Sequence, residues 1–239
     1  VIQVGNITMV PPSADDACGN DIIGEHLNRF NIDLLLTNMD SWLLHKYGER
    51  GVFWAAWTPI DDLEAPPQVV EALQGCHKPL PYTKHGEEAL KAAGITKAEC
   101  MPIGVESEGF YADPEGRAMM RDHLRVPPDG FLIGMVANNR GYPLRKGFDV
   151  TFEAFAKLRQ KYPKTYLYVH TNPTGGADRP PLEHWLTPLG LSMSDVLWPR
   201  LYDYTLGYSQ TLMRHLYNSF DVLAVPSVGE GFLLPAVEA

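Results

Sequence analysis

The chain has 239 residues, 45% hydrophobic and 21% charged, proportions typical of an ordinary soluble globular protein. The formal net charge of −9, without any long run of Lys or Arg, argues against a nucleic-acid partner and against docking on anionic lipid. No apolar run approaches the ~20 residues that span a bilayer. The three scattered cysteines, Cys18, Cys76 and Cys100, indicate reduced thiols and a cytoplasmic protein.

Short apolar runs alternate with longer amphipathic stretches, and this alternation predicts an α/β protein with mostly parallel sheets. The chain opens on a strand-like segment, residues 1–4, without an initiator Met. It ends inside an expected helix, so we expect a piece of a longer protein. In the first half the expected strands are 32–36, 52–57 and 78–83, and the expected helices are 67–73 and 87–93.

The second half has a clearer pattern. Phe148, Phe152, Phe155 and Leu158 share one face of a helix expected over 148–162. The other expected elements are a short helix at 116–124, strands at 131–137, 166–169, 196–198 and 222–225, and a helix at 209–219. Gly and Pro frame the short helix, which indicates a linker between two domains. We therefore predict domains at 1–110 and 129–239, joined by a linker at 111–128.

The closing segment, residues 226–239, is the first candidate site. A strand is expected to run into a glycine-flanked turn, and Pro235 suits the first turn of a new helix. Ligands collect beyond the carboxyl ends of parallel strands, and a helix N-terminus offers N–H groups to a phosphate. Glu230 on the turn and Glu238 on the helix could then hold hydroxyl pairs at opposite ends of one ligand. The alternative is a solvated loop charge and a surface helix residue.

The second candidate site is the loop after strand 131–137, which carries Asn138 and Asn139 and then Arg145 and Lys146. Cations are unfavourable beside a helix N-terminus, so the adjacent pair suggests a bound anion such as a diphosphate. Such cations would stabilise the charge on a departing nucleotide, where one well-aimed donor contributes roughly 3 kcal/mol. The alternative is a solvated basic loop.

These two segments together carry a family resemblance. Residues 230–239 read Glu-Gly-Phe-Leu-Leu-Pro-Ala-Val-Glu-Ala, and Arg145 precedes Lys146-Gly147. They resemble the family 4 glycosyltransferases, whose pattern is Glu-Gly-Phe-Gly-Leu-Pro-x-x-Glu-Ala with an Arg…Lys-Gly pair. The resemblance covers the second half, and residues 40–44, 58–61 and 103–106 look like the later part of that family's acceptor domain. Leu233 departs from the usual glycine, and the family's first strand, glycine-rich loop and closing helices are absent.

The resemblance implies a GT-B-like fold, with two Rossmann-like α/β domains whose parallel sheets face a cleft, here truncated at both ends. It also implies that Arg145 and Lys146 grip the diphosphate, that Glu230 faces the donor sugar, and that Glu238 holds the ribose. We therefore expect Arg145, Lys146 and Glu230 to be catalytic. The further expected donor-binding residues are Asn138, Asn139, Arg200, Leu201, Gly231, Phe232, Leu233 and Leu234.

The implied activity is transfer of a hexosyl unit, with retention, from a UDP- or GDP-sugar such as GDP-mannose to a glycan, lipid or small acceptor. The family needs no cofactor or divalent metal for transfer, and the sequence contains no Asp-x-Asp. Asp61 and His170 are candidate acceptor or sugar contacts, or else an ordinary turn residue and an ordinary histidine. One alternative is an inactive nucleotide- or sugar-binding module, favoured by the missing glycine-rich loop. A GT-B epimerase fits the glutamate motif less well.

Overall fold

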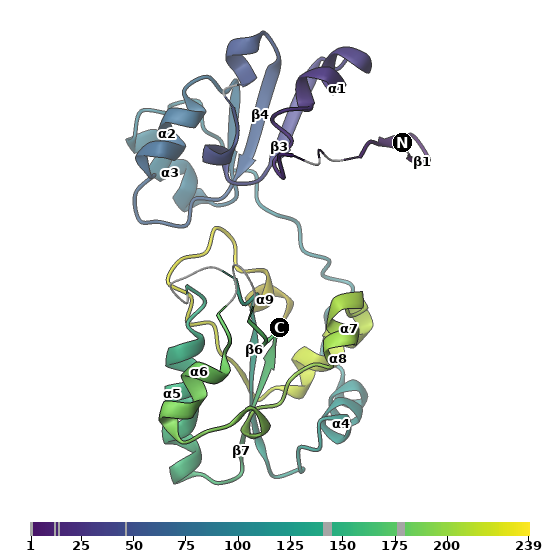
Figure 1. The fold of residues 1–239 in the computed structure, drawn as a ribbon, viewed down its shortest axis with the longest axis vertical. Coiled ribbons are helices and arrows are strands. Elements are labelled where there is room, and N and C mark those ends of the chain that lie inside the picture. Colours follow the sequence, from purple (N-terminus) through teal and green to yellow (C-terminus); the bar gives the residue numbers. More distant parts are fainter. Residues whose placement is uncertain (1, 12, 14, 46, 141–144, 176–179) are drawn as a thin grey trace. The chain divides into compact units, whose positions relative to one another are not determined.

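The computed structural model describes residues 2–11, 13, 15–45, 47–140, 145–175 and 180–239. The chain divides into two compact units, residues 1–103 with 230–232 and residues 104–229 with 233–239 (Figure 1). Each unit has its own three-stranded parallel sheet. Among the described residues, no helix has the length and apolar character needed to cross a membrane.

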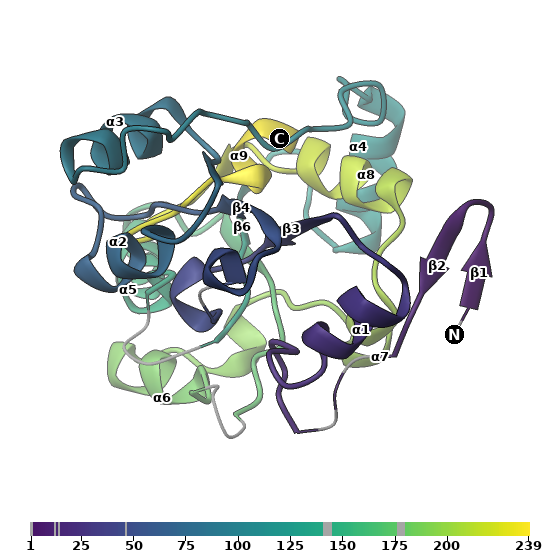
Figure 2. The ribbon, with the colours of Figure 1, turned by 90° about the horizontal axis from the view of Figure 1, so that it is seen from above.

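The first unit is built on the sheet β3-β4-β5, in which β3 is Leu34–Asn38, β4 is Phe53–Thr58 and β5 is Lys78–Pro81. Its helices are α1 (Ile23–Arg29), α2 (Pro67–Leu73) and α3 (Lys84–Ala92), with 3₁₀ turns at Ser41–Leu43 and Tyr47–Arg50. An antiparallel hairpin of β1 (Ile2–Val4) and β2 (Ile7–Met9) precedes them (Figure 2).

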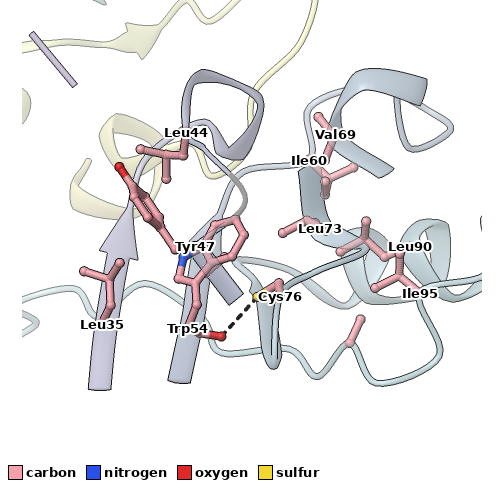
Figure 3. Close-up of a cluster of buried hydrophobic side chains, with 12 residues drawn as sticks. Leu35, Leu44, Tyr47, Trp54, Ile60, Val69, Leu73, Cys76, Leu90 and Ile95 are labelled. Atoms are coloured by element: carbon pink, nitrogen blue, oxygen red, sulfur yellow. Dashed lines mark hydrogen bonds between the residues drawn. The ribbon is translucent and has the colours of Figure 1, made fainter. Parts of the chain in front are cut away.

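A single hydrophobic cluster forms the core of the first unit. Trp54, Leu73 and Leu90 are completely buried, which shows that β4 is covered by the helices that follow it (Figure 3). The polar atoms of this core are satisfied internally: the Trp54 indole N–H donates to Thr37 Oγ1 at 3.0 Å, and the Cys76 thiol donates to the Trp54 carbonyl at 3.3 Å. The three cysteines form no disulfide.

The second unit is built on the sheet β7-β6-β8, in which β6 is Phe131–Val136, β7 is Thr165–His170 and β8 is Val222–Leu223. Its helices are α4 (Pro114–His123), α5 (Phe148–Lys161), α6 (Glu183–Leu186), α7 (Leu201–Leu206), α8 (Gln210–Ser219) and α9 (Leu234–Glu238). Short 3₁₀ turns lie at Thr187–Leu189 and Met193–Asp195.

Helices cover both faces of this second sheet, with α5 and α6 on one side and α4 and α8 on the other (Figure 1). The alternation of side chains along a strand explains the two layers. In β7, Leu167 and Val169 pack in the cluster of α5, whereas Tyr168 between them packs in the cluster of α4 and α8. The sheet is therefore buried on both faces, as is usual for parallel sheets.

The predicted α/β class and most of the predicted elements are confirmed, with bounds that differ by one to three residues. The helix at 67–73 has the predicted bounds. The strand expected at 196–198 is reduced to one bridge between Tyr168 and Leu197. Residues 111–128, expected as a linker, contain α4, which packs against α8. The strand-like segment at 1–4 contains β1, whereas β2, α1, α6 and α7 were not predicted.

Candidate functional site

The basic loop and the closing segment lie against each other at one edge of the second sheet. They follow β6 and β8, which are parallel neighbours, so their carboxyl ends meet at the same edge. The Val228 N–H donates to the Arg145 carbonyl at 2.9 Å, and the Arg145 guanidinium donates through Nη1 to the Gly229 carbonyl at 2.5 Å. Two segments more than 80 residues apart thus form one continuous surface.

Gly147 makes this close approach possible. It has φ +71°, in the left-handed region, and it ends the basic loop directly before α5. A Cβ placed there would lie 2.5 Å from the Pro226 carbonyl oxygen, which is closer than carbon and oxygen can come. The glycine of the Arg…Lys-Gly pattern therefore leaves room for the basic loop to pack against the segment that follows β8.

Replacement of Gly147 by Ala is expected to destabilise the protein by about 2–3 kcal/mol, since the left-handed backbone and the clash with Pro226 add together. Gly190→Ala is the matched control. Gly190 also has φ +71°, but a Cβ at that position would meet nothing within 4 Å, so this variant should cost only about 1 kcal/mol. Urea unfolding of both variants measures the difference, and equal losses would show that the Pro226 contact is unimportant.

The start of α5 supplies a second feature suited to an anion. The helix has 14 residues, and its N-cap is Gly147, which has no side chain to cap the first turn. Its first N–H groups and the positive end of its dipole therefore lie next to Arg145, which is exposed, and Lys146, which is half-buried. Two cations at a helix N-terminus can act together on one anionic group. Residues 141–144 of this loop lie outside the described residues.

The two asparagines predicted to bind the donor differ in position. Asn138 is exposed, whereas Asn139 is only 1% exposed. The Asn139 side-chain amide donates to the carbonyls of Asn172, at 3.2 Å, and Pro180, at 2.8 Å. Its Oδ1 is buried and has no hydrogen-bond partner within the described part of the chain. Asn139 thus fastens the loops after β6 and β7, and only its oxygen remains for a further contact.

The glutamate motif is divided between the two compact units. Glu230, Gly231 and Phe232 group with the first unit, and residues 233–239 with the second. Leu233 is the N-cap of α9 with φ −88°, so leucine fits without strain where the family pattern has glycine. Leu234 begins α9 and Glu238 ends it.

Glu238 has a partner that the sequence did not reveal. The Tyr217 hydroxyl on α8 donates to Glu238 Oε2 at 2.7 Å. Tyr217 is 4% exposed, and burial followed by the neighbouring Glu238 carboxylate raises the pKa of its hydroxyl. The phenol is therefore a permanent proton donor to this carboxylate at any ordinary pH.

His170 ends β7 within a group of aromatic rings. Its Nδ1 lies 3.0 Å from the Tyr168 hydroxyl, and its ring centroid lies 5.3 Å from that of Tyr204 and 4.7 Å from that of Tyr208. Burial lowers the pKa of His170 to about 4, so the imidazole is neutral at physiological pH. Arg200 and Leu201, at the start of α7, are both exposed, and Arg200 pairs with Asp203 at 3.6 Å.

The lowered pKa of His170 predicts a pH-dependent stability. Below pH ~6.5 His170 is protonated in the unfolded state but still neutral in the folded state. The free energy of unfolding should therefore fall from pH 6.5 towards 4, by on the order of 3 kcal/mol. His170→Asn keeps an acceptor near Tyr168 and should remove this part of the dependence. His184→Asn, at an exposed histidine, should leave it intact. Chemical unfolding at several pH values tests this, and an unchanged slope in His170→Asn would contradict it.

Asp61 is the one predicted site residue in the main body of the first unit. It is exposed and follows β4, which ends at Thr58, so it lies just beyond the carboxyl edge of that sheet. The other predicted residues of the second unit lie on the ends of its strands or on the loops and helices that follow them: Arg145, Lys146, the two asparagines, His170 and Glu238. The contacts of Tyr217 with Glu238, and of Tyr204 and Tyr208 with His170, could not be predicted from spacing, because the partners are more than 20 residues apart in the sequence.

No protein-family model matches the chain. In sequence it is similar to D-inositol 3-phosphate glycosyltransferases. It is 33% identical to that of Stackebrandtia nassauensis over 160 residues, 63% of this chain and 32% of the relative. It is 30% identical to that of Mycobacterium leprae over 158 residues, 64% of this chain and 34% of the relative. The alignments thus cover about a third of the length of the curated relatives.

Solved structures share its fold. An α,α-trehalose 6-phosphate synthase from Burkholderia multivorans matches with TM-score 0.67 and 19% identity, over 92% of this chain and 57% of that one. HepE of Anabaena, in complex with UDP-glucose, matches with TM-score 0.63 and 16% identity, over 86% of this chain and 56% of that one. A UDP-forming α,α-trehalose-phosphate synthase from Burkholderia xenovorans, in complex with glucose-6-phosphate, matches with TM-score 0.63 and 17% identity, over 92% of this chain and 59% of that one. The predicted GT-B-like fold and the resemblance to glycosyltransferases are confirmed.

Proposed function

We propose that the chain is the nucleotide-sugar-handling part of a retaining glycosyltransferase. The observation that carries this proposal is the joining of the basic loop to the closing segment through Arg145, Val228 and Gly229. This arrangement puts two cations at the start of α5 beside the segment that leads to Glu238. Sequence similarity to glycosyltransferases and the shared fold support the proposal.

The donor in this proposal is a UDP-sugar, with Arg145 and Lys146 on the diphosphate, Glu238 on the ribose and Glu230 on the hexose. The bond from the anomeric carbon to the diphosphate breaks, the acceptor oxygen bonds to that carbon on the same face, and the proton of the acceptor hydroxyl passes to the departing diphosphate. The two cations stabilise the leaving diphosphate without a metal ion. A fold neighbour in complex with UDP-glucose and another that is UDP-forming favour uridine over guanosine.

The donor and the acceptor are assigned to different parts of the chain. We assign the donor to residues 129–239 and the acceptor to residues 1–110, with Asp61 as an acceptor contact and His170 as a sugar or acceptor contact. A phosphorylated polyol is the acceptor class of choice, because relatives and neighbours include an inositol 3-phosphate glycosyltransferase and a complex with glucose-6-phosphate. The unpaired cysteines suit a cytoplasmic protein.

A panel of UDP, GDP, ADP and their sugars tests the proposal by thermal shift, followed by assays of donor hydrolysis and transfer with inositol phosphate or glucose-6-phosphate. We expect stabilisation by UDP and its sugars, and a product with the anomeric configuration of the donor, formed equally well in EDTA. Binding without turnover would instead identify a module that only recognises the nucleotide. Stabilisation by none of these compounds would refute the proposal.

A further inference from the structure

The hydroxyl of Tyr217 lies in a cluster made mainly of aromatic and aliphatic side chains. The ring packs edge-on against Phe110, with centroids 5.8 Å apart, and against Phe220, with centroids 6.3 Å apart. Leu216 and Met120 belong to the same core cluster. A phenylalanine would fill this space equally well, so packing alone does not explain the hydroxyl. Its hydrogen bond to Glu238 Oε2, at 2.7 Å, is the interaction that a phenylalanine could not make.

This hydrogen bond connects two helices of the second unit. Tyr217 lies in α8, which packs in the core, and Glu238 lies in α9. A glutamate side chain on a helix has several rotamers. A charge-assisted bond from a buried phenol restricts that choice and directs the other carboxylate oxygen, Oε1, to a fixed place.

We infer that Tyr217 is a positioning residue for the donor, which holds the Glu238 carboxylate in the orientation that accepts hydrogen bonds from the ribose hydroxyls. This inference rests on the proposed function and adds to it the group that orders the ribose contact. Tyr217 does not touch the ligand: it acts through Glu238. Its effect should therefore appear only with ligands that carry the hydroxyls to which Glu238 binds.

The test compares UDP with 2′,3′-dideoxy-UDP, by calorimetric titration of the wild-type chain and of Tyr217→Phe. Tyr217→Phe should weaken the binding of UDP by about tenfold and that of the dideoxy compound by less than about twofold. Both affinities are measured on the same folded molecules, so their ratio does not depend on the fraction of the variant that folds. Tyr166→Phe, in a half-buried tyrosine that packs against the same cluster, is the control and should change neither affinity.

A second comparison measures the effect of Tyr217→Phe in a variant that lacks the Glu238 carboxylate. If Tyr217 acts through Glu238, adding Tyr217→Phe to Glu238→Ala should cost no further affinity for UDP. Equal weakening of the two ligands, or additive losses in the double variant, would overturn the inference while leaving the donor site in place. Failure of the wild-type chain to bind UDP, GDP or ADP would instead refute the proposed function, and the positioning role with it.

Discussion

Lys146→Ala is expected to lower the affinity for UDP by about 100-fold, the equivalent of about 3 kcal/mol for a charged contact to a phosphate. The reason is the position of Lys146 beside Arg145 and the first turn of α5, where an anion gains from both cations and from the helix. Because Lys146 lies on a loop and is only half-buried, its loss should change the free energy of unfolding by no more than about 0.5 kcal/mol.

Lys157→Ala provides the control for charge. Lys157 is on the same helix, where it forms an i,i+4 ion pair with Glu153, and its replacement removes one positive charge far from the loop. Calorimetric titration should give wild-type affinity for this variant. Equal affinities of Lys146→Ala and the wild-type chain for UDP would show that the basic loop is not the diphosphate site.

Arg121→Met is expected to lower the free energy of unfolding by about 3–4 kcal/mol, the range for breaking a buried ion pair. Arg121 is 7% exposed and donates to the Ser219 carbonyl at 3.0 Å and to Asp221 at 3.1 Å. It also donates to the carbonyl of Gly130, just before β6. One guanidinium therefore joins α4 to the end of α8 and to the start of β6, and methionine would remove its donors from all of these acceptors.

Arg117→Met is the matched control, because Arg117 is on the same helix and pairs with the same carboxylate at 2.5 Å. Its side chain is 36% exposed, compared with 9% for Arg121, so water can replace part of what is lost. We expect a smaller loss, of about 1–1.5 kcal/mol. Denaturant unfolding followed by tryptophan fluorescence measures both, and an equal or larger loss for Arg117→Met would contradict the structural role given to Arg121.

Elements with a strong local pattern can be predicted from the sequence. The helix α5 is recognisable because Phe148, Phe152 and Phe155 recur at helical spacing, and all three are buried. The helix α1 is not recognisable, because none of its residues is fully buried and its apolar face consists only of Ile23 and Leu27, which pack against the core of the first unit. The strand expected at 196–198 forms only one bridge to β7, since a short apolar run does not reveal whether a neighbouring strand will pair with it.

In the candidate site, too, the motifs could be predicted from the sequence, but the contacts that support them could not. The motifs predict Arg145, Lys146 and Glu238 as site residues, and the order of strands explains why the two segments meet. The sequence could not reveal that Asn139 is engaged by backbone carbonyls or that Tyr217 holds Glu238, because these contacts depend on how loops and helices pack. A motif thus indicates which residue types take part, whereas their supporting contacts require the folded chain.

A crystal structure of the chain with bound UDP tests the central claim, that the basic loop and the closing segment form one donor site. The account predicts a diphosphate in contact with Arg145 and Lys146 at the start of α5, and ribose hydroxyls on the Glu238 carboxylate, itself still bonded to Tyr217. UDP bound elsewhere on the chain, or a diphosphate without contact to either cation, would contradict it.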